Sequence, residues 1–306
     1  MNRDKRMSVP IGGLEIESPL LVASGVWPMD SECWPTGAMK NAGGLCTKGL
    51  TLQPKTGNTG IRIWETPCGI MNSIGLENPG IDAFLKDEYP GLSKMDIPVI
   101  FNLSFDNKED LLSLFERLHD TAGNVPVELN VSCPNVSRGG LSWAQNSASL
   151  ETIISLARKN WEGPLWVKLS PNVASVTETA LVAENAGADA VVVANTWLGA
   201  IIDVEDLQPV FHNIHAGLSG PAVFPLALRL VWETSSSADI PVIASGGVAS
   251  WQDAAAMIAA GASAVQIGSA LFSDLEIIDK IHKGLAGFLE RKNIESIVDL
   301  VGAAKA

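Results

Sequence analysis

Short apolar runs, rich in β-branched residues, alternate along the chain with stretches in which apolar residues recur at helical spacing. Leu111, Leu114, Phe115 and Leu118 follow the i, i+3, i+4, i+7 spacing that gives a helix one apolar face. The apolar runs are nearly continuous, which is typical of parallel strands that are covered on both faces. Eight strands are expected, at Pro19–Ala23, Gly44–Lys48, Pro98–Leu103, Val125–Val131, Leu165–Leu169, Ala190–Ala194, Pro241–Ala244 and Ala264–Ile267.

Eight strand-and-helix units in about 250 to 300 residues predict an α/β fold of the (β/α)8 TIM barrel type. A doubly wound open sheet is the alternative. The chain has 306 residues, 46% of them hydrophobic and 18% charged, so we expect one large core and a single domain over residues 1–306. Two connections, Leu50–Ile97 and Thr196–Ile240, are longer than a plain loop, and long excursions of this kind serve as lids or substrate loops.

Charge and cysteine content narrow the classes of partner. The 21 basic and 34 acidic residues leave a net charge of −13, which repels nucleic acid and anionic membranes. The charged start lacks a following apolar segment, and no apolar run reaches the roughly 18 residues of a membrane span, so a cytoplasmic protein is expected. Four scattered cysteines, Cys33, Cys46, Cys68 and Cys133, predict neither a disulfide framework nor a metal or iron–sulfur site in this chain.

Polar residues stand where several predicted strands end. Asn130 lies near the end of the fourth strand, and Cys133 follows it. Pro134 restricts the backbone at Cys133 to an extended conformation, which predicts that this loop is held as an active-site lid. A lone cysteine is more often packing material than a reactive group, and a lone lysine more often a surface residue. The combination at the strand ends instead predicts a polar pocket for a planar heterocycle with carbonyl and imide groups. The other members of this set are Lys48, Asn102, Lys168, Asn195 and Thr196.

Small residues follow the last two strands, at Gly246-Gly247 and Gly268-Ser269. Glycine leaves the backbone amides bare, and the loops after strands seven and eight are the usual phosphate site of this barrel. Either pair alone is compatible with a tight turn. Together they predict a phosphate-bearing cofactor or substrate.

In this order along the chain, the motifs resemble those of the dihydroorotate dehydrogenases, specifically the class 1B catalytic subunit. The likeness spans nearly the whole chain. It is carried by Ala23-Ser24-Gly25, Thr47-Lys48-Gly49, Asn72 to Gly80, Glu128 to Asn135, Val167 to Asn172, Asn195-Thr196, Leu218 to Ala222, Gly246-Gly247 and Gly261 to Val265. The chain departs from the usual pattern at Gly25-Val26-Trp27-Pro28 and at Trp197, where leucine is common.

The resemblance implies FMN and a dihydroorotate or orotate ligand. The residues implied for FMN are Ser24, Lys48, Gly49, Asn102, Asn130, Lys168, Ala194, Gly220, Gly246, Gly247, Gly268 and Ser269. Those implied for the substrate are Lys48, Asn72, Ser73, Ile74, Gly75, Leu76, Asn130, Asn195 and Thr196. Lys48 is also a catalytic residue of the family pattern, because a fixed cation stabilises the reduced, anionic ring.

The implied reaction belongs to de novo pyrimidine (UMP) biosynthesis. Cys133 removes a proton from dihydroorotate while a hydride leaves for FMN, and a homodimer passes the electrons to NAD through a subunit carrying FAD and an iron–sulfur cluster, in a heterotetramer. Three rival hypotheses remain. They are an FMN barrel acting on another cyclic amide such as a dihydropyrimidine, a flavin-free barrel isomerase or lyase, and a barrel kept only as a docking scaffold.

Overall fold

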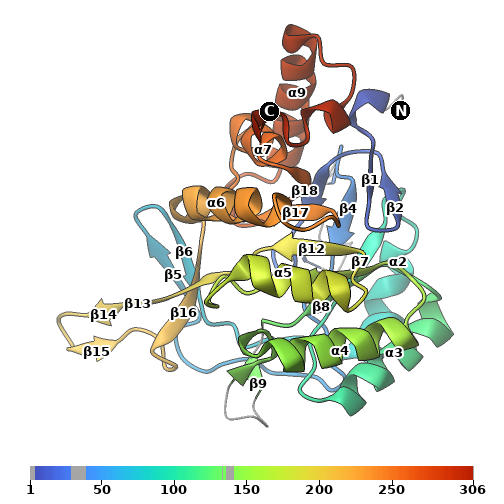
Figure 1. Ribbon diagram of the computed structural model, residues 1–306. Helices are drawn as coiled ribbons and strands as arrows, with labels where there is room; N and C mark the ends of the chain where they lie inside the picture. The colour runs from blue at the N-terminus through green and yellow to red at the C-terminus, as the bar shows by residue number, and fades with distance from the viewer. Residues whose placement is uncertain (1–3, 29–38, 133, 136–140, 306) are drawn as a thin grey trace.

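The eight predicted strands close into a parallel barrel in the computed structural model of the chain, which describes residues 4–28, 39–132, 134–135 and 141–305 (Figure 1). Nearly all their residues are buried, as expected for strands covered on both faces. The (β/α)8 barrel is therefore confirmed and the open sheet is excluded. In chain order the strands are β3 (Leu20–Val22), β4 (Gly44–Cys46), β7 (Val99–Leu103), β8 (Val127–Asn130), β11 (Leu165–Lys168), β12 (Ala190–Val193), β17 (Val242–Ser245) and β18 (Ala262–Ile267).

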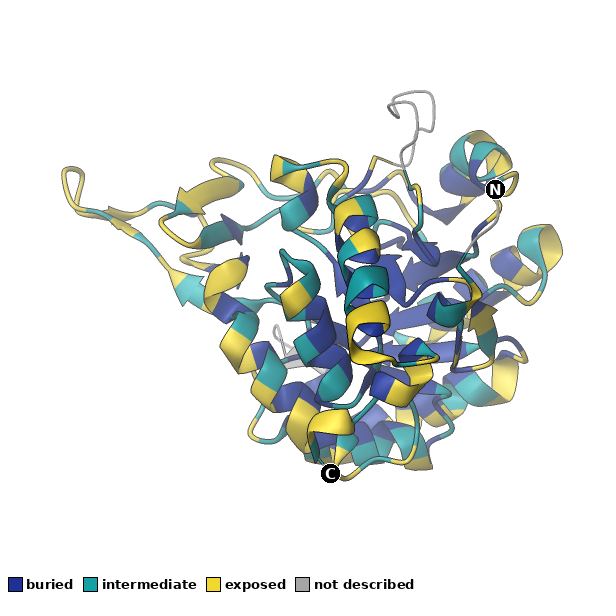
Figure 2. Ribbon diagram, turned by 90° about the horizontal axis from the view of Figure 1, so that it is seen from above, coloured by how far each residue is buried: buried dark blue, intermediate teal, exposed yellow. Residues whose placement is uncertain are grey.

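Amphipathic helices surround the barrel, with their buried sides toward the strands (Figure 2). In α3 (Lys108–Ala122) the buried residues are the four predicted from the spacing, and the side chain of Asn107 caps its first turn by accepting from the Asp110 amide at 2.8 Å. The remaining helices are α1 (Ile81–Ala83), α2 (Tyr89–Leu92), α4 (Ser147–Asn160), α5 (Val176–Asn185), α6 (Phe224–Ser235), α7 (Trp251–Ala259), α8 (Ala270–Ser273) and α9 (Ile277–Lys292). In the described part of the chain, no helix has both the length and the apolar character to cross a membrane.

A hairpin of β1 (Val9–Ile11) and β2 (Leu14–Ile16) lies against the amino end of the barrel strands. The fully buried Trp166 of β11 donates its indole N–H to the Gly12 carbonyl of this hairpin at 3.0 Å. Since the hairpin occupies the amino end, the opposite rim is the end that remains for chemistry.

The two long connections meet over the carboxyl rim and form one antiparallel sheet in the order β13-β16-β6-β5. Two strands come from the first connection, β5 (Ile63–Thr66) and β6 (Gly69–Asn72), and two from the second, β13 (Trp197–Ala200) and β16 (His215–Ser219). Beyond β13 the chain extends as an arm that contains β14 (Ile202–Asp203) and β15 (Gln208–Pro209) (Figure 1).

A second small hairpin follows the fourth barrel strand, where β9 (Pro134–Asn135) pairs with β10 (Leu141–Ser142). This is the position of the predicted lid loop. Its central residues 136–140, and the predicted base Cys133, lie outside the described residues.

Candidate active site

The predicted polar residues meet at the carboxyl rim because they end neighbouring parallel strands. Asn102 of β7 is level with Glu128 of β8, and Asn130 of β8 is level with Lys168 of β11. Side chains two residues apart on a strand share a face, so Glu128 and Asn130 point to the same side of β8. Polar side chains inside the barrel therefore form two layers. The upper layer is at the carboxyl rim, and the lower layer lies beneath it.

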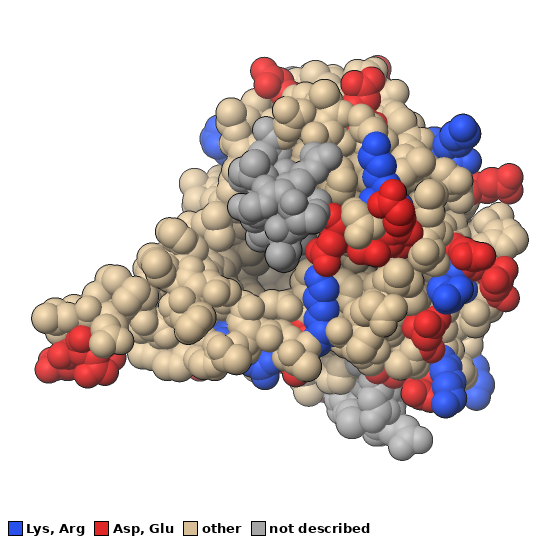
Figure 3. Space-filling model, turned by 90° about the horizontal axis from the view of Figure 1, so that it is seen from below, with Lys and Arg blue, Asp and Glu red and all other residues tan. Residues whose placement is uncertain are grey.

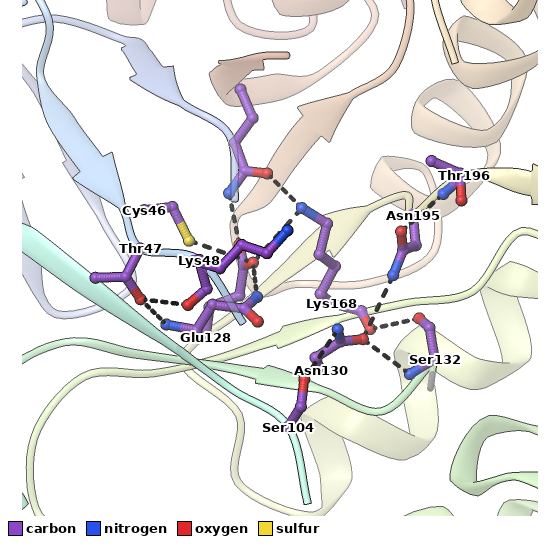
Figure 4. A network of polar contacts seen from close by, with 12 residues as sticks. Cys46, Thr47, Lys48, Ser104, Glu128, Asn130, Ser132, Lys168, Asn195 and Thr196 are labelled. Atoms are coloured by element: carbon purple, nitrogen blue, oxygen red, sulfur yellow. Dashed lines mark hydrogen bonds and ion pairs between the residues drawn. The ribbon is translucent and has the colours of Figure 1, made fainter. Parts of the chain in front are cut away.

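The lower layer is a network around the fully buried carboxylate of Glu128 (Figure 4). Glu128 accepts hydrogen bonds from the amide nitrogens of Asn102 and Gln266, each at 2.5 Å. The Lys168 ammonium lies 3.5 Å from the carboxylate and donates to the Gln266 side-chain oxygen at 2.9 Å. The Cys46 thiol also donates to Glu128, at 3.4 Å. Burial, first, and then the charge of Glu128 raise the pKa of the Cys46 thiol, which keeps that thiol neutral.

Lys48 brings a second cation to the rim. No hydrogen bond or ion pair holds its ammonium within the described residues, and burial lowers its pKa, with the charge of Glu77 opposing that shift. Its Nζ lies 3.6 Å from the position that a Cβ on Gly25 would take, next to Ser24. A partly desolvated, unpaired cation favours an anionic ligand, because the ligand restores the charge partner that water no longer provides.

Asn102 presents an unused acceptor to the same mouth. Its Oδ1 is buried and has no hydrogen-bond partner in the described part of the chain. A Cβ on Gly49 would lie 3.1 Å from this oxygen and 3.3 Å from Cδ2 of Leu76. Buried polar atoms are rarely left unpaired, so an N–H donor from a bound molecule fits here. The imide N–H of a flavin ring is such a donor, and the residues present therefore fit FMN.

Asn130 and Asn195 form the upper layer. Asn195 Nδ2 donates to Asn130 Oδ1 at 3.4 Å, and Asn130 Nδ2 donates to the Ser104 hydroxyl at 3.3 Å. The Ser132 amide also donates to Asn130 Oδ1, at 3.2 Å, and the Ser132 hydroxyl donates to the Lys168 carbonyl at 3.2 Å. The residue immediately before Cys133 is therefore tied to the rim through the same asparagine (Figure 4).

The predicted substrate loop, Asn72 to Leu76, leaves the end of β6 and passes over the barrel mouth. Asn72 pairs with Gly217 of β16, and a Cβ on Gly217 would lie only 2.2 Å from the Thr196 hydroxyl. Gly75 and Leu76 both have positive φ, +75° and +57°, which turns the loop and brings the Leu76 side chain beside Gly49. The loop and Thr196 thus approach the mouth from the two separate connections.

A cavity of about 320 Å³ lies where the glycine pairs predict a phosphate. Gly220, Gly247 and Ser269 line it, together with Gly69 and the exposed Glu65 from the β5–β6 hairpin. Gly246 and Gly268 are chain neighbours of two lining residues. Gly246 and Gly247 have φ of +142° and +75°, a conformation that favours glycine. The loops after β17 and β18 thus line one cavity, and its volume suits part of a small ligand.

Two comparisons connect this geometry with known proteins. The family model for dihydroorotate dehydrogenase matches residues 6–289. Two curated proteins named dihydroorotate dehydrogenase B (NAD(+)), catalytic subunit, are each 40% identical to this chain: one from Geobacter sp. (strain M21) over 97% of both chains, and one from Geotalea daltonii over 98% of both. A protein of the same name from Petrotoga mobilis is 40% identical over 96% of this chain and 98% of its own length.

The chain belongs to the dihydroorotate dehydrogenase family. The resemblance predicted from the motifs is thereby confirmed. Within this family member, the structure places the described site residues on one rim and in one cavity next to it. Their individual roles toward FMN and substrate stay predictions, as does the role of Cys133.

The sequence predicts two members of the lower layer, Asn102 and Lys168, but not the other three, Glu128, Gln266 and Cys46. Glu128 lies in one of the motifs that carry the resemblance, and no role was predicted for it. A signal was available for Glu128, because it stands two residues before Asn130 in an otherwise apolar strand and therefore shares its inward face. Gln266 is likewise a polar residue inside the apolar run of β18.

Of the two tryptophans that depart from the family's pattern, Trp197 lies closer to the predicted phosphate loop. A Cβ on Gly246 would be 3.4 Å from its ring. Trp27 is buried, with 5% of its surface exposed, and belongs to the main core. The Trp197 ring thus lies against the predicted phosphate loop.

Proposed function

We propose that this chain oxidises dihydroorotate to orotate with bound FMN, in the pathway to pyrimidine nucleotides. The observation that carries the proposal is the barrel mouth, where neither the Lys48 ammonium nor the Asn102 oxygen has a partner among the described residues and Leu76 of the predicted substrate loop lies beside Gly49. Membership in the dihydroorotate dehydrogenase family indicates the reaction, which is the oxidation of dihydroorotate. The names of the curated relatives favour dihydroorotate over a dihydropyrimidine.

FMN, when bound, supplies the acceptor for the hydride. The chain's own residues hold and orient the reactants. The residues that would hold the flavin ring are Ser24, Lys48, Gly49, Asn102, Asn130, Lys168 and Ala194. Those that would hold its phosphate are Gly220, Gly246, Gly247, Gly268 and Ser269. The cations of Lys48 and Lys168 would favour negative charge on a ring bound there, in a site with little water.

Dihydroorotate would bind against the Asn72 to Leu76 loop. The amides of this loop meet the carboxylate of dihydroorotate, and the side chains of Asn130, Asn195 and Thr196 pair with its ring. Cys133, as thiolate, takes the proton from the ring carbon next to the carbon that loses the hydride. Orotate leaves with one double bond more than dihydroorotate.

The electrons pass to NAD through a second subunit that carries FAD and an iron–sulfur cluster, in a heterotetramer built on a homodimer of this chain. The relatives' names support a subunit arrangement, since they describe an NAD(+)-linked catalytic subunit. Dihydroorotate is the small-molecule partner, and the cytoplasmic location expected from the sequence stays a prediction.

The test is anaerobic titration of the purified protein. We expect a yellow protein with the visible spectrum of FMN that is bleached by dihydroorotate, with one orotate formed per flavin, and that is not bleached by dihydrouracil. Bleaching by dihydrouracil alone would assign the barrel to dihydropyrimidines. A protein that binds no flavin after reconstitution would refute the proposal.

A further inference from the structure

The buried carboxylate of Glu128 determines how two neighbouring amides point. An ionised carboxylate only accepts hydrogen bonds, so the amide nitrogens of Asn102 and Gln266 must face it, and both do so at 2.5 Å. The oxygen of each amide then points the other way. For Asn102 this leaves the buried Oδ1 next to Gly49, where it has no partner within the part of the chain that the structure describes, and for Gln266 it leaves the oxygen that accepts from Lys168.

Glu128 also sets the charge beneath the site. Its side chain has no exposed surface, and the Lys168 side chain beside it is only 7% exposed. A buried pair of this kind is nearly neutral as a unit, and removal of one member leaves the other uncompensated. The carboxylate of Glu128 accepts from the Cys46 thiol and from two amides and lies beside Lys168, so its surroundings are those that an anion needs.

We propose that Glu128 is a positioning residue that holds Asn102 as an acceptor and Lys168 as a charge-balanced donor, and so sets the reduction potential of the flavin above it. The proposal rests on the proposed binding of FMN. It adds a residue that touches neither flavin nor substrate but acts through two that do.

The experiment measures the midpoint potential of bound FMN, without dihydroorotate, in Glu128→Gln. Loss of the negative charge leaves Lys168 unbalanced, which favours the anionic reduced ring. We expect the ratio of reduced to oxidised flavin at a given potential to rise at least tenfold, which is about 30 mV for a two-electron couple. Glu128→Asp keeps the charge and should return most of the way to the wild-type potential. Cys46→Ala removes one uncharged donor to the same carboxylate and should shift the potential much less than Glu128→Gln does.

A wild-type potential in Glu128→Gln would overturn the proposal, and so would an equal shift in Cys46→Ala. If Glu128→Gln does not fold, the proposal is tested with Lys168→Gln and with the double variant that combines Glu128→Gln and Lys168→Gln. The single lysine variant should lower the potential, and the double variant, which is again neutral, should fold and return toward the wild-type value. Failure of that return overturns the proposal.

The two proposals fail in different ways. Wild-type protein that holds FMN but is not reduced by dihydroorotate would refute the proposed function and leave the effect of Glu128 measurable. Wild-type protein that is reduced by dihydroorotate, together with an unchanged potential in Glu128→Gln, would refute only the role of Glu128.

Discussion

At the scale of single residues, the site is defined by polar groups that the protein buries without completing their contacts. The Lys48 ammonium is partly desolvated and unpaired within the described residues, and the Asn102 oxygen is buried and unpaired there. The buried oxygen of Asn102 costs free energy of folding, on the order of 1–3 kcal/mol for an unsatisfied polar group. A bound ligand would provide the missing partners of Lys48 and Asn102, so these two groups indicate the position of the ligand.

The first prediction concerns Cys133, whose neighbour Ser132 is anchored to Asn130 and to the Lys168 carbonyl. Cys133→Ala should slow reduction of the flavin by dihydroorotate by about 10² to 10⁴, the usual contribution of a positioned general base, and leave FMN and orotate binding nearly intact. Cys133→Ser should be slow at neutral pH and recover as the pH rises, because its hydroxyl needs a higher pH to lose its proton. Anaerobic stopped-flow measures the rate, and a wild-type rate in Cys133→Ala would assign the cysteine to packing.

At the scale of elements, the predicted phosphate site in the loops after β17 and β18 can be tested most directly by substitution. A Cβ on Gly247 would lie 2.6 Å from the Phe224 amide nitrogen, so any side chain there disturbs the backbone. A Cβ on Gly268 meets only Ala23 and Val26, at 3.7 and 3.9 Å, which is ordinary contact. Gly268 therefore accepts a charge with little structural cost.

We expect Gly268→Asp to purify largely without FMN, and Gly268→Asn, of the same size but neutral, to retain it. Two like charges about 4 Å apart near a protein surface repel by about 4 kcal/mol, well above the ~1.4 kcal/mol of a tenfold loss in affinity. Flavin content from the visible spectrum and the FMN dissociation constant measure the effect. Equal FMN affinity in the two variants would move the phosphate away from this loop.

At the scale of the whole molecule, the arm beyond β13 is the part that the barrel core does not support. Its side chains include Val204 and Leu207, which are 72% and 81% exposed. An isolated two-stranded hairpin such as β14–β15 is marginally stable in water, and exposed apolar side chains that gather together mark contacts with other chains. Acidic side chains crowd the tip of the arm, at Asp203, Glu205 and Asp206 (Figure 3), so two tips would repel each other and each must meet a different surface.

We therefore expect the arm to contribute to the proposed homodimer. The double variant Val204→Ser with Leu207→Ser should shift the isolated chain from dimer toward monomer in sedimentation velocity, with FMN retained. Leu112→Ser, a 37% exposed leucine on α3, is the matched control and should leave the dimer intact. The experiment contains no other subunit. If the double variant is still a dimer, the arm does not form the homodimer and is assigned to contact with the electron-transfer subunit. A monomeric wild type would refute the homodimer.

The barrel and most of its rim could be predicted from the amino-acid sequence. Parallel strands buried on both faces need apolar runs of four to six residues, and such runs are legible without any partner, which is why all eight predicted strands overlap those of the structure. The same local reason predicts the positions of four polar residues, because a polar side chain at the end of a buried strand can meet water or a ligand only at the rim. These residues are Lys48, Asn102, Asn130 and Lys168.

Tertiary structure alone decided which distant segments meet. Nothing local in Asn72 or Gly217 announces that the two long connections pair as β6 and β16, because register between antiparallel strands 145 residues apart depends on where the barrel holds their ends. The Glu128 network likewise joins β4, β7, β8, β11 and β18, and Glu128 and Gln266 are 138 residues apart. A buried carboxylate is tolerated only where several strands converge to satisfy it, and that convergence exists only once the barrel has closed.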